Sequence, residues 1–143
     1  MNEIKVIVSG HGEFASGIQA ALSLLIKVPE NWRFIDFTTG MSDQDLHQEF
    51  IQALGAAPFE ETVFFTDLAG GTPYNVAATL AADAAQLQVV AGCNLASLME
   101  TMFQTFGNAH QLANALISTS HASIKRFDPN APISRNADLD DGI

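Results

Sequence analysis

Residues 62–73 read TVFFTDLAGGTP and contain the strongest structural signal in the chain. The first five residues are apolar or β-branched without alternation, which is typical of a strand buried inside a parallel sheet. Asp67 ends this strand, two glycines form a turn, and Thr72 and Pro73 suit the N-cap and the first position of a helix. A strand that passes through a glycine turn into a helix predicts an α/β fold.

Strands and helices alternate on both sides of this segment. Residue patterns predict further strands at 4–9, 32–37 and 88–91, and helices at 14–27, 43–56, 73–85, 94–105 and 110–122. The order predicts a doubly wound α/β domain over residues 1–128, with a mostly parallel sheet in strand order 2-1-3-4. Residues 123–127 are a candidate short fifth strand, and residues 129–143 are expected to form an acidic, disordered tail.

The composition limits the classes of protein to which the chain can belong. It has 143 residues, 48% of them hydrophobic, and a formal net charge of −10. Such an acidic surface disfavours binding to nucleic acid or to anionic membranes. The sequence has no apolar run near the ~20 residues of a membrane-spanning helix, no signal-peptide pattern and no metal-ligand spacing. We therefore expect a cytoplasmic protein with neither a metal nor a cofactor, in which Cys93 is a buried small residue.

A histidine and an aspartate follow two strands that the predicted strand order places side by side. The first strand ends in Ser9-Gly10-His11-Gly12, and the third ends at Asp67. Because the carboxyl ends of parallel strands share one edge of the sheet, His11 and Asp67 are expected to meet there. A carboxylate that accepts a hydrogen bond from one imidazole nitrogen leaves the other free to act as a nucleophile. The pair therefore predicts a catalytic histidine.

The glycine-rich turn before the third helix offers donors for an anion. Gly70 and Gly71 let backbone N–H groups approach a ligand, and the helix that follows turns its positive end towards the same point. The Thr72 hydroxyl adds a side-chain donor, and Gly12 leaves room beside the histidine for a docked partner. These four residues are the predicted binding site for an anion beside His11, such as a phosphoryl group.

Other residues that could take part in chemistry are assigned structural or merely solvent-exposed roles. His47 falls on the polar face of the second predicted helix, and His110 and His121 lie at the two ends of the last one. Asn94 follows the fourth strand, where it either caps a helix or lines the rim of the site. The cap is the favoured interpretation.

Three segments together show a family resemblance: IVSGHGEFASGI at 7–18, FFTDLAGGTPYNVAATLA at 64–81 and VVAGCNLASLMET at 89–101. They resemble the IIA domains of the mannose family of the bacterial phosphoenolpyruvate-dependent sugar phosphotransferase system. The similarity extends from about residue 4 to about residue 127 and looks closest to the branch that serves N-acetylgalactosamine.

The resemblance implies a phosphotransferase that works as a relay. His11 would take a phosphoryl group from the phosphocarrier HPr, and Asp67 would orient the imidazole. His11 would then pass the group to the IIB component, which phosphorylates sugar entering through the IIC/IID membrane complex. The resemblance also implies a homodimer in which the strand at 123–127 is exchanged between subunits. No IIB segment follows in the sequence, so we expect a free-standing IIA.

Three alternatives remain open at this point. The phosphocarrier subunit of phosphotransferase-dependent dihydroxyacetone kinase has a similar first domain with a histidine at a strand end. A non-catalytic domain could use the same crevice to bind an anion. A histidine-based phosphatase would need an arginine beside the histidine, and Arg33, Arg126 and Arg135 lie outside the motif segments.

Overall fold

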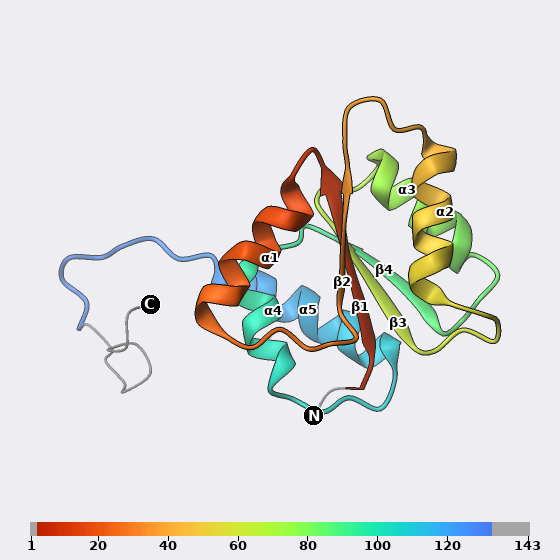
Figure 1. Ribbon diagram of the computed structural model, residues 1–143. Coiled ribbons are helices and arrows are strands. Elements are labelled where there is room, and N and C mark those ends of the chain that lie inside the picture. The colour runs from red at the N-terminus through yellow and green to blue at the C-terminus, as the bar shows by residue number, and fades with distance from the viewer. Residues whose placement is uncertain (1–2, 133–143) are drawn as a thin grey trace.

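A single parallel sheet organises the chain. The computed structural model describes residues 3–132, in which four strands pair in the order β2-β1-β3-β4, as predicted (Figure 1). The strands are β1 (Lys5–His11), β2 (Arg33–Phe37), β3 (Thr62–Thr66) and β4 (Leu87–Ala91). The helices are α1 (Phe14–Leu25), α2 (Asp43–Leu54), α3 (Thr72–Ala81), α4 (Leu95–Met102) and α5 (Ala109–Ser123). All three strand pairings are parallel, so the carboxyl ends of the strands share one edge.

Helices cover both faces of the sheet, as expected of a doubly wound fold. Helices α1, α4 and α5 lie on one face, and α2 and α3 lie on the other (Figure 1). Successive strand residues point to opposite faces. Val8 and Phe65 therefore enter the first core, whereas Ile7 and Phe64 enter the second, and all four are fully buried. This double burial explains the continuous apolar run of the third strand.

The start of α3 differs by one residue from the prediction. Thr72 is already helical, and Gly71 rather than Thr72 is the N-cap, with no side-chain cap. Gly71 has extended backbone angles (φ −75°, ψ 167°), and its carbonyl accepts the first hydrogen bond of the helix from Asn75 N at 2.9 Å. The Thr72 hydroxyl is therefore not engaged in capping the helix.

Four predicted helices end earlier than expected, among them α1 at Leu25 rather than at 27 and α4 at Met102 rather than at 105. Helix α2 starts at its predicted cap, Ser42, but ends at Leu54 because Gly55 adopts a positive φ of 78°. Helix α3 ends at Ala81 rather than at 85. Tight turns, with Ala84 N bonded to Ala81 O and then Leu87 N to Ala84 O, lead the chain from there into β4.

The predicted fifth strand is not formed within the single chain. Ser123 is the last residue of α5, and residues 124–132 of the described chain belong to no strand. Ile124 has extended backbone angles and is 82% exposed, and Phe127 is 79% exposed. A strand requires a hydrogen-bonded neighbour, and this segment has none in one copy. The predicted acidic tail at 129–143 lies for the most part outside the described residues.

Candidate active site

The site lies where the two central strands end. His11 is the last residue of β1, and Asp67 directly follows β3. The strand register pairs Ser9 with Thr66, and Asp67 N donates to Ser9 O at 3.2 Å, which extends the pairing to the edge of the sheet. Neighbouring strand ends thus bring together two residues that are 56 positions apart in the chain, as predicted.

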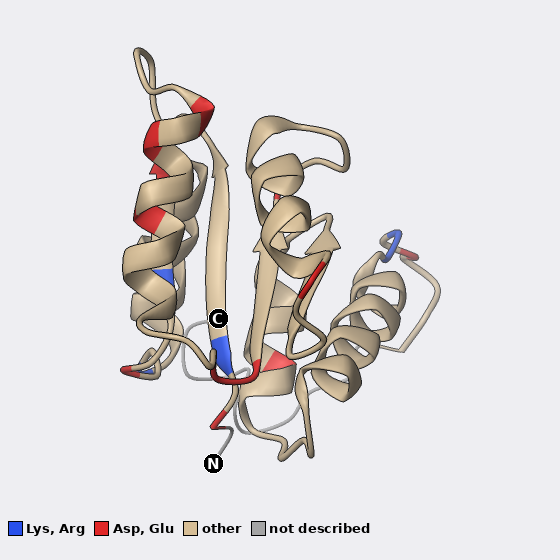
Figure 2. Ribbon diagram, turned by 90° about the vertical axis from the view of Figure 1, so that its right-hand side faces the viewer, with Lys and Arg blue, Asp and Glu red and all other residues tan. Residues whose placement is uncertain are grey.

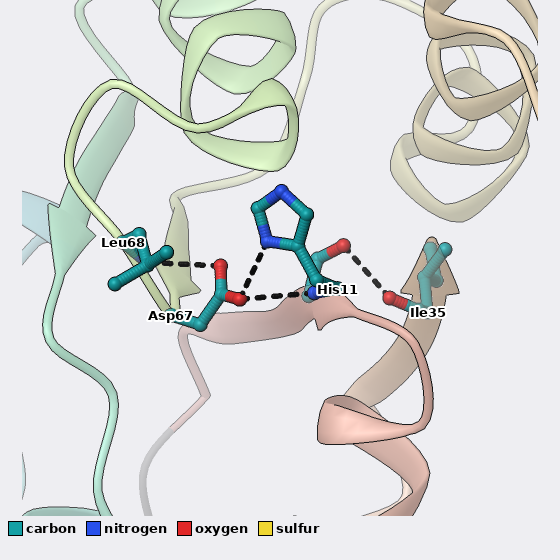
Figure 3. Close-up of polar contacts among 5 residues, drawn as sticks. His11, Ile35, Asp67 and Leu68 are labelled. Carbon is teal, nitrogen blue, oxygen red and sulfur yellow. Dashed lines mark hydrogen bonds and ion pairs between the residues drawn. The ribbon is translucent and has the colours of Figure 1, made fainter. Parts of the chain in front are cut away.

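A single carboxylate holds the histidine by two hydrogen bonds. Oδ2 of Asp67 lies 2.7 Å from Nδ1 of the His11 ring and accepts the His11 backbone N–H at 2.9 Å (Figure 3). Oδ1 accepts the backbone N–H of Leu68 at 2.9 Å. Partial burial would by itself raise the pKa of Asp67, but these hydrogen bonds from His11 and Leu68 outweigh it and hold that pKa below its ordinary value. Asp67 is therefore ionised at neutral pH.

The ionised carboxylate determines which imidazole nitrogen is reactive. A carboxylate can only accept hydrogen bonds, so Nδ1 of His11 carries the proton. In the neutral imidazole, Nε2 then keeps its lone pair. The His11 side chain is 45% exposed, whereas that of Asp67 is 11% exposed. The arrangement therefore presents one nucleophilic nitrogen to solvent and keeps its orienting partner largely covered.

The predicted glycine turn lies against the imidazole. A Cβ built on Gly71 would come within 2.8 Å of Cε1 and 3.5 Å of Nε2 of His11, so only glycine allows this approach. Gly70 has a positive φ of 81°, and its carbonyl accepts a hydrogen bond from the Asn75 side chain at 3.0 Å. The turn and the first residues of α3 thus face the free nitrogen. The first N–H groups of a helix have no partner within it and attract anions.

A residue that the sequence did not predict to be part of the site lies on the side of the His11 ring opposite Asp67. Phe37, at the end of β2, has its ring centroid 5.9 Å from that of His11, with the ring planes at 78°. The Phe37 carbonyl accepts the N–H of Gly12 at 2.8 Å, and Gly12 turns there with a positive φ of 61°. The predicted strand at 32–37 contained this residue, but its contact with His11 depends on the register between β1 and β2.

The remaining candidates take no part in the contact between His11 and Asp67. Asn94 caps α4, as its side chain accepts Ser97 N at 2.9 Å and donates to Ser120 Oγ at 2.7 Å. Burial, assisted by the negative charge of Asp67, raises the pKa of the Cys93 thiol well above its ordinary value, so it is protonated at neutral pH. His47 lies within α2, and His110 and His121 lie at the two ends of α5. None of these three histidines is part of the His11–Asp67 pair.

Two further findings concern residues 3–132. Within this range, no group of three or more His, Cys, Asp or Glu residues is arranged to hold a metal ion. Over the same range, none of the helices is both long enough and apolar enough to pass through a bilayer.

Comparison with known proteins places the chain in a family. The family described as "PTS system fructose IIA component" matches residues 5–119. The fructose-specific EIIA component of Bacillus subtilis is 36% identical over 100 residues, which cover 69% of this chain and 68% of that protein.

Solved structures agree with this family. A phosphotransferase system component EIIA from Streptococcus agalactiae has a TM-score of 0.78 at 33% identity, covering 86% of this chain and 96% of that chain. A mannose/sorbose-specific IIA subunit from Enterococcus faecalis has a TM-score of 0.79 at 26% identity, covering 93% and 100% respectively. The chain therefore belongs to the mannose family of IIA components, the phosphotransferases that carry phosphoryl groups within sugar phosphotransferase systems.

Proposed function

We propose that His11 is the residue that carries the phosphoryl group, and that Nε2 is the atom that bonds to phosphorus. The observation that supports this assignment is the 2.7 Å contact between Nδ1 and Asp67, which leaves Nε2 free beside Gly71. Nucleophilic catalysis by histidine requires this arrangement, in which a carboxylate holds one ring nitrogen and the other nitrogen is free to attack.

The transfer itself is a displacement at phosphorus. The lone pair of Nε2 attacks the phosphorus of phosphohistidine on the donor protein. The new Nε2–P bond forms as the donor's N–P bond breaks, and the bonding electrons return to the donor imidazole. Positive charge grows on the His11 ring during the attack, and the Asp67 carboxylate stabilises it through Nδ1–H. The reverse displacement discharges His11 to the next carrier.

The turn before α3 is the proposed cradle for the phosphoryl oxygens. The backbone N–H groups of Gly70, Gly71 and Thr72 lie at the positive end of the helix, where that of Gly71 also donates to Leu68 O at 3.2 Å, and the Thr72 hydroxyl is not used as a cap. Gly12 faces open space, because a Cβ built on it would meet no atom within 4 Å, and so leaves room beside His11. These groups offset the charge of a phosphoryl group without a metal ion.

The proposed partners follow from the relay. HPr is the proposed donor and a IIB component the proposed acceptor, both meeting His11 in the cytoplasm, and IIB serves a IIC/IID membrane complex. The relatives carry fructose, mannose and sorbose in their names. The N-acetylgalactosamine-type branch stays a prediction from the motifs of this chain.

A homodimer is also part of the proposal. The apolar side chains of Ile124 and Phe127 are exposed in the single copy, and the outer edge of β4 has no neighbouring strand among the described residues. Exchange of residues 123–127 would cover both. Sedimentation equilibrium is expected to give twice the chain mass, and deletion of residues 124–143 is expected to give monomers. A monomeric full-length chain would contradict the exchange.

Reconstitution of the relay tests the proposed function. The protein is incubated with labelled phosphoenolpyruvate, enzyme I and HPr, and then mixed with a IIB component of the mannose family. We expect the chain to become labelled only when HPr is present and to lose the label to IIB. A chain that takes up no label, or that releases it only as inorganic phosphate, would contradict the role of a carrier.

A further inference from the structure

We propose that Phe37 is a positioning residue for phosphoryl transfer at His11, an inference that rests on the proposed function. Phe37 ends β2 and pairs with His11 in the register of the two strands. Their ring centroids are 5.9 Å apart and the ring planes meet at 78°. This edge-to-face geometry is one that aromatic pairs prefer, so the contact favours one orientation of the imidazole.

The contacts of the imidazole with Asp67 and Gly71 do not fix its orientation completely, so a third contact is needed. The hydrogen bond from Nδ1 to Asp67 fixes one corner of the ring, and the Gly71 backbone lies next to Cε1. The ring could still tilt about the line of that hydrogen bond. Since β1 lies between β2 and β3, Phe37 approaches from the side opposite Asp67 and limits this tilt.

Phe37 is itself held firmly. Its side chain packs against the core beneath α2 and α3, in which Leu46 and Phe50 are fully buried. Its carbonyl accepts the N–H of Gly12 at 2.8 Å, which ties the end of β2 to the turn that follows His11. Phe37 can therefore restrict the His11 ring, because any movement of Phe37 would disturb the packing of the core.

The contact bears on the rate of transfer because it favours the reactive orientation of the His11 ring. Loss of the aromatic ring should slow the transfer about three- to tenfold.

The test separates positioning of the ring from docking of the donor. Phe37→Leu, Phe37→Tyr and the wild-type protein are phosphorylated either by phospho-HPr or by phosphoramidate, a small donor that needs no docking surface. Phe34→Leu is the matched control, because Phe34 lies on the same strand but packs in the other core. Circular dichroism melts confirm that each variant is folded. Phe37→Met replaces the leucine variant if that variant unfolds.

We expect Phe37→Leu to be slower with both donors, with an unchanged KM for phospho-HPr, and Phe37→Tyr to retain the wild-type rate within about twofold. Phe34→Leu should behave like the wild type. The NMR signal of the His11 Nδ1 proton should broaden in Phe37→Leu only, as its bond to Asp67 loosens. Wild-type rates for Phe37→Leu, or equal losses in the leucine and tyrosine variants, would overturn the proposal. A wild-type protein that accepts no phosphoryl group would instead overturn the proposed function.

Discussion

The carboxylate of Asp67 both joins the strand ends and orients the His11 ring. Its carboxylate accepts the N–H of His11, the Nδ1–H of the same residue and the N–H of Leu68. The backbone bonds close the edge of the sheet, and the bond to the ring selects the tautomer of the nucleophile. Because its pKa is held below the ordinary value, the carboxylate stays charged throughout the physiological range. One residue thus couples the stability of the strand ends to the reactivity of His11.

A pH-dependent stability difference should follow from Asp67. A carboxyl whose pKa is lower in the folded state stabilises the fold above its unfolded pKa of about 3.9, and this contribution is lost as the pH falls through the folded value. Asp67→Asn should therefore melt at a lower temperature than the wild type at pH 7, and the gap should close below about pH 4. Thermal melts of both proteins between pH 3 and pH 7 measure this difference in melting temperature. A gap that is the same at every pH would contradict the role of the charge.

Gly71 should be sensitive to a single methyl group. Its backbone angles suit any residue, but an added Cβ would meet Cε1 of His11 at 2.8 Å and push the ring aside. We expect Gly71→Ala to slow phosphorylation of His11 by about tenfold or more with little loss of stability. Gly17→Ala is the control, because Gly17 lies within α1 with open space around it. Equal rates for the two alanine variants would show that the turn does not restrain the ring.

At the level of the elements, strand ends and helix starts build the site. The parallel order and the pairing of His11 with Asp67 could be predicted, because continuous apolar strands and glycine turns are local signals with a known spatial consequence. The contact between Phe37 and His11 could not be predicted, since it depends on the register between β1 and β2. The N-cap of α3 lies one residue earlier than predicted, because Gly71 takes the extended conformation of an N-cap and Thr72 is already helical.

Asn94 should stabilise helices rather than support chemistry. Its side chain caps α4 through Ser97 N and also reaches Ser120 of α5, so it joins two elements. Asn94→Ala should lower the free energy of unfolding by about 1–2 kcal/mol, and Asn94→Ser, which can still cap, by less. Denaturant titration measures both. Phosphorylation of His11 should keep its wild-type rate in each folded variant, and a slower rate would place Asn94 in the site.

The whole molecule combines a strongly acidic surface with two uncharged loops beside the site. The net charge is −10, and acidic side chains follow α2, with Asp43, Asp45 and Glu49 all exposed (Figure 2). The loops at 38–41 and 68–72 contain no charged residue, and the turn after His11 contains one exposed carboxylate, that of Glu13. A partner that brings a phosphoryl group therefore meets few carboxylates near His11, while basic side chains around its own site can be attracted by the acidic helix.

This charge distribution predicts a salt-dependent encounter. The second-order rate of phosphoryl transfer from phospho-HPr should fall as ionic strength rises from about 0.01 M to about 1 M, because the Debye length shrinks from about 30 Å to about 3 Å. Transfer from phosphoramidate should change much less, which separates steering from chemistry. Stopped-flow quench measurements at several salt concentrations provide the comparison. A rate from phospho-HPr that does not depend on salt would contradict electrostatic steering.

The identity of the phosphorylated residue tests the account most directly. The wild-type chain and the variants His11→Ala, His47→Ala, His110→Ala and His121→Ala are each incubated with labelled phosphoenolpyruvate, enzyme I and HPr. We expect label that is stable in base and labile in acid, as for phosphohistidine, on every protein except His11→Ala. Label that persists on a folded His11→Ala variant would contradict the central claim that this histidine is the phosphoryl carrier.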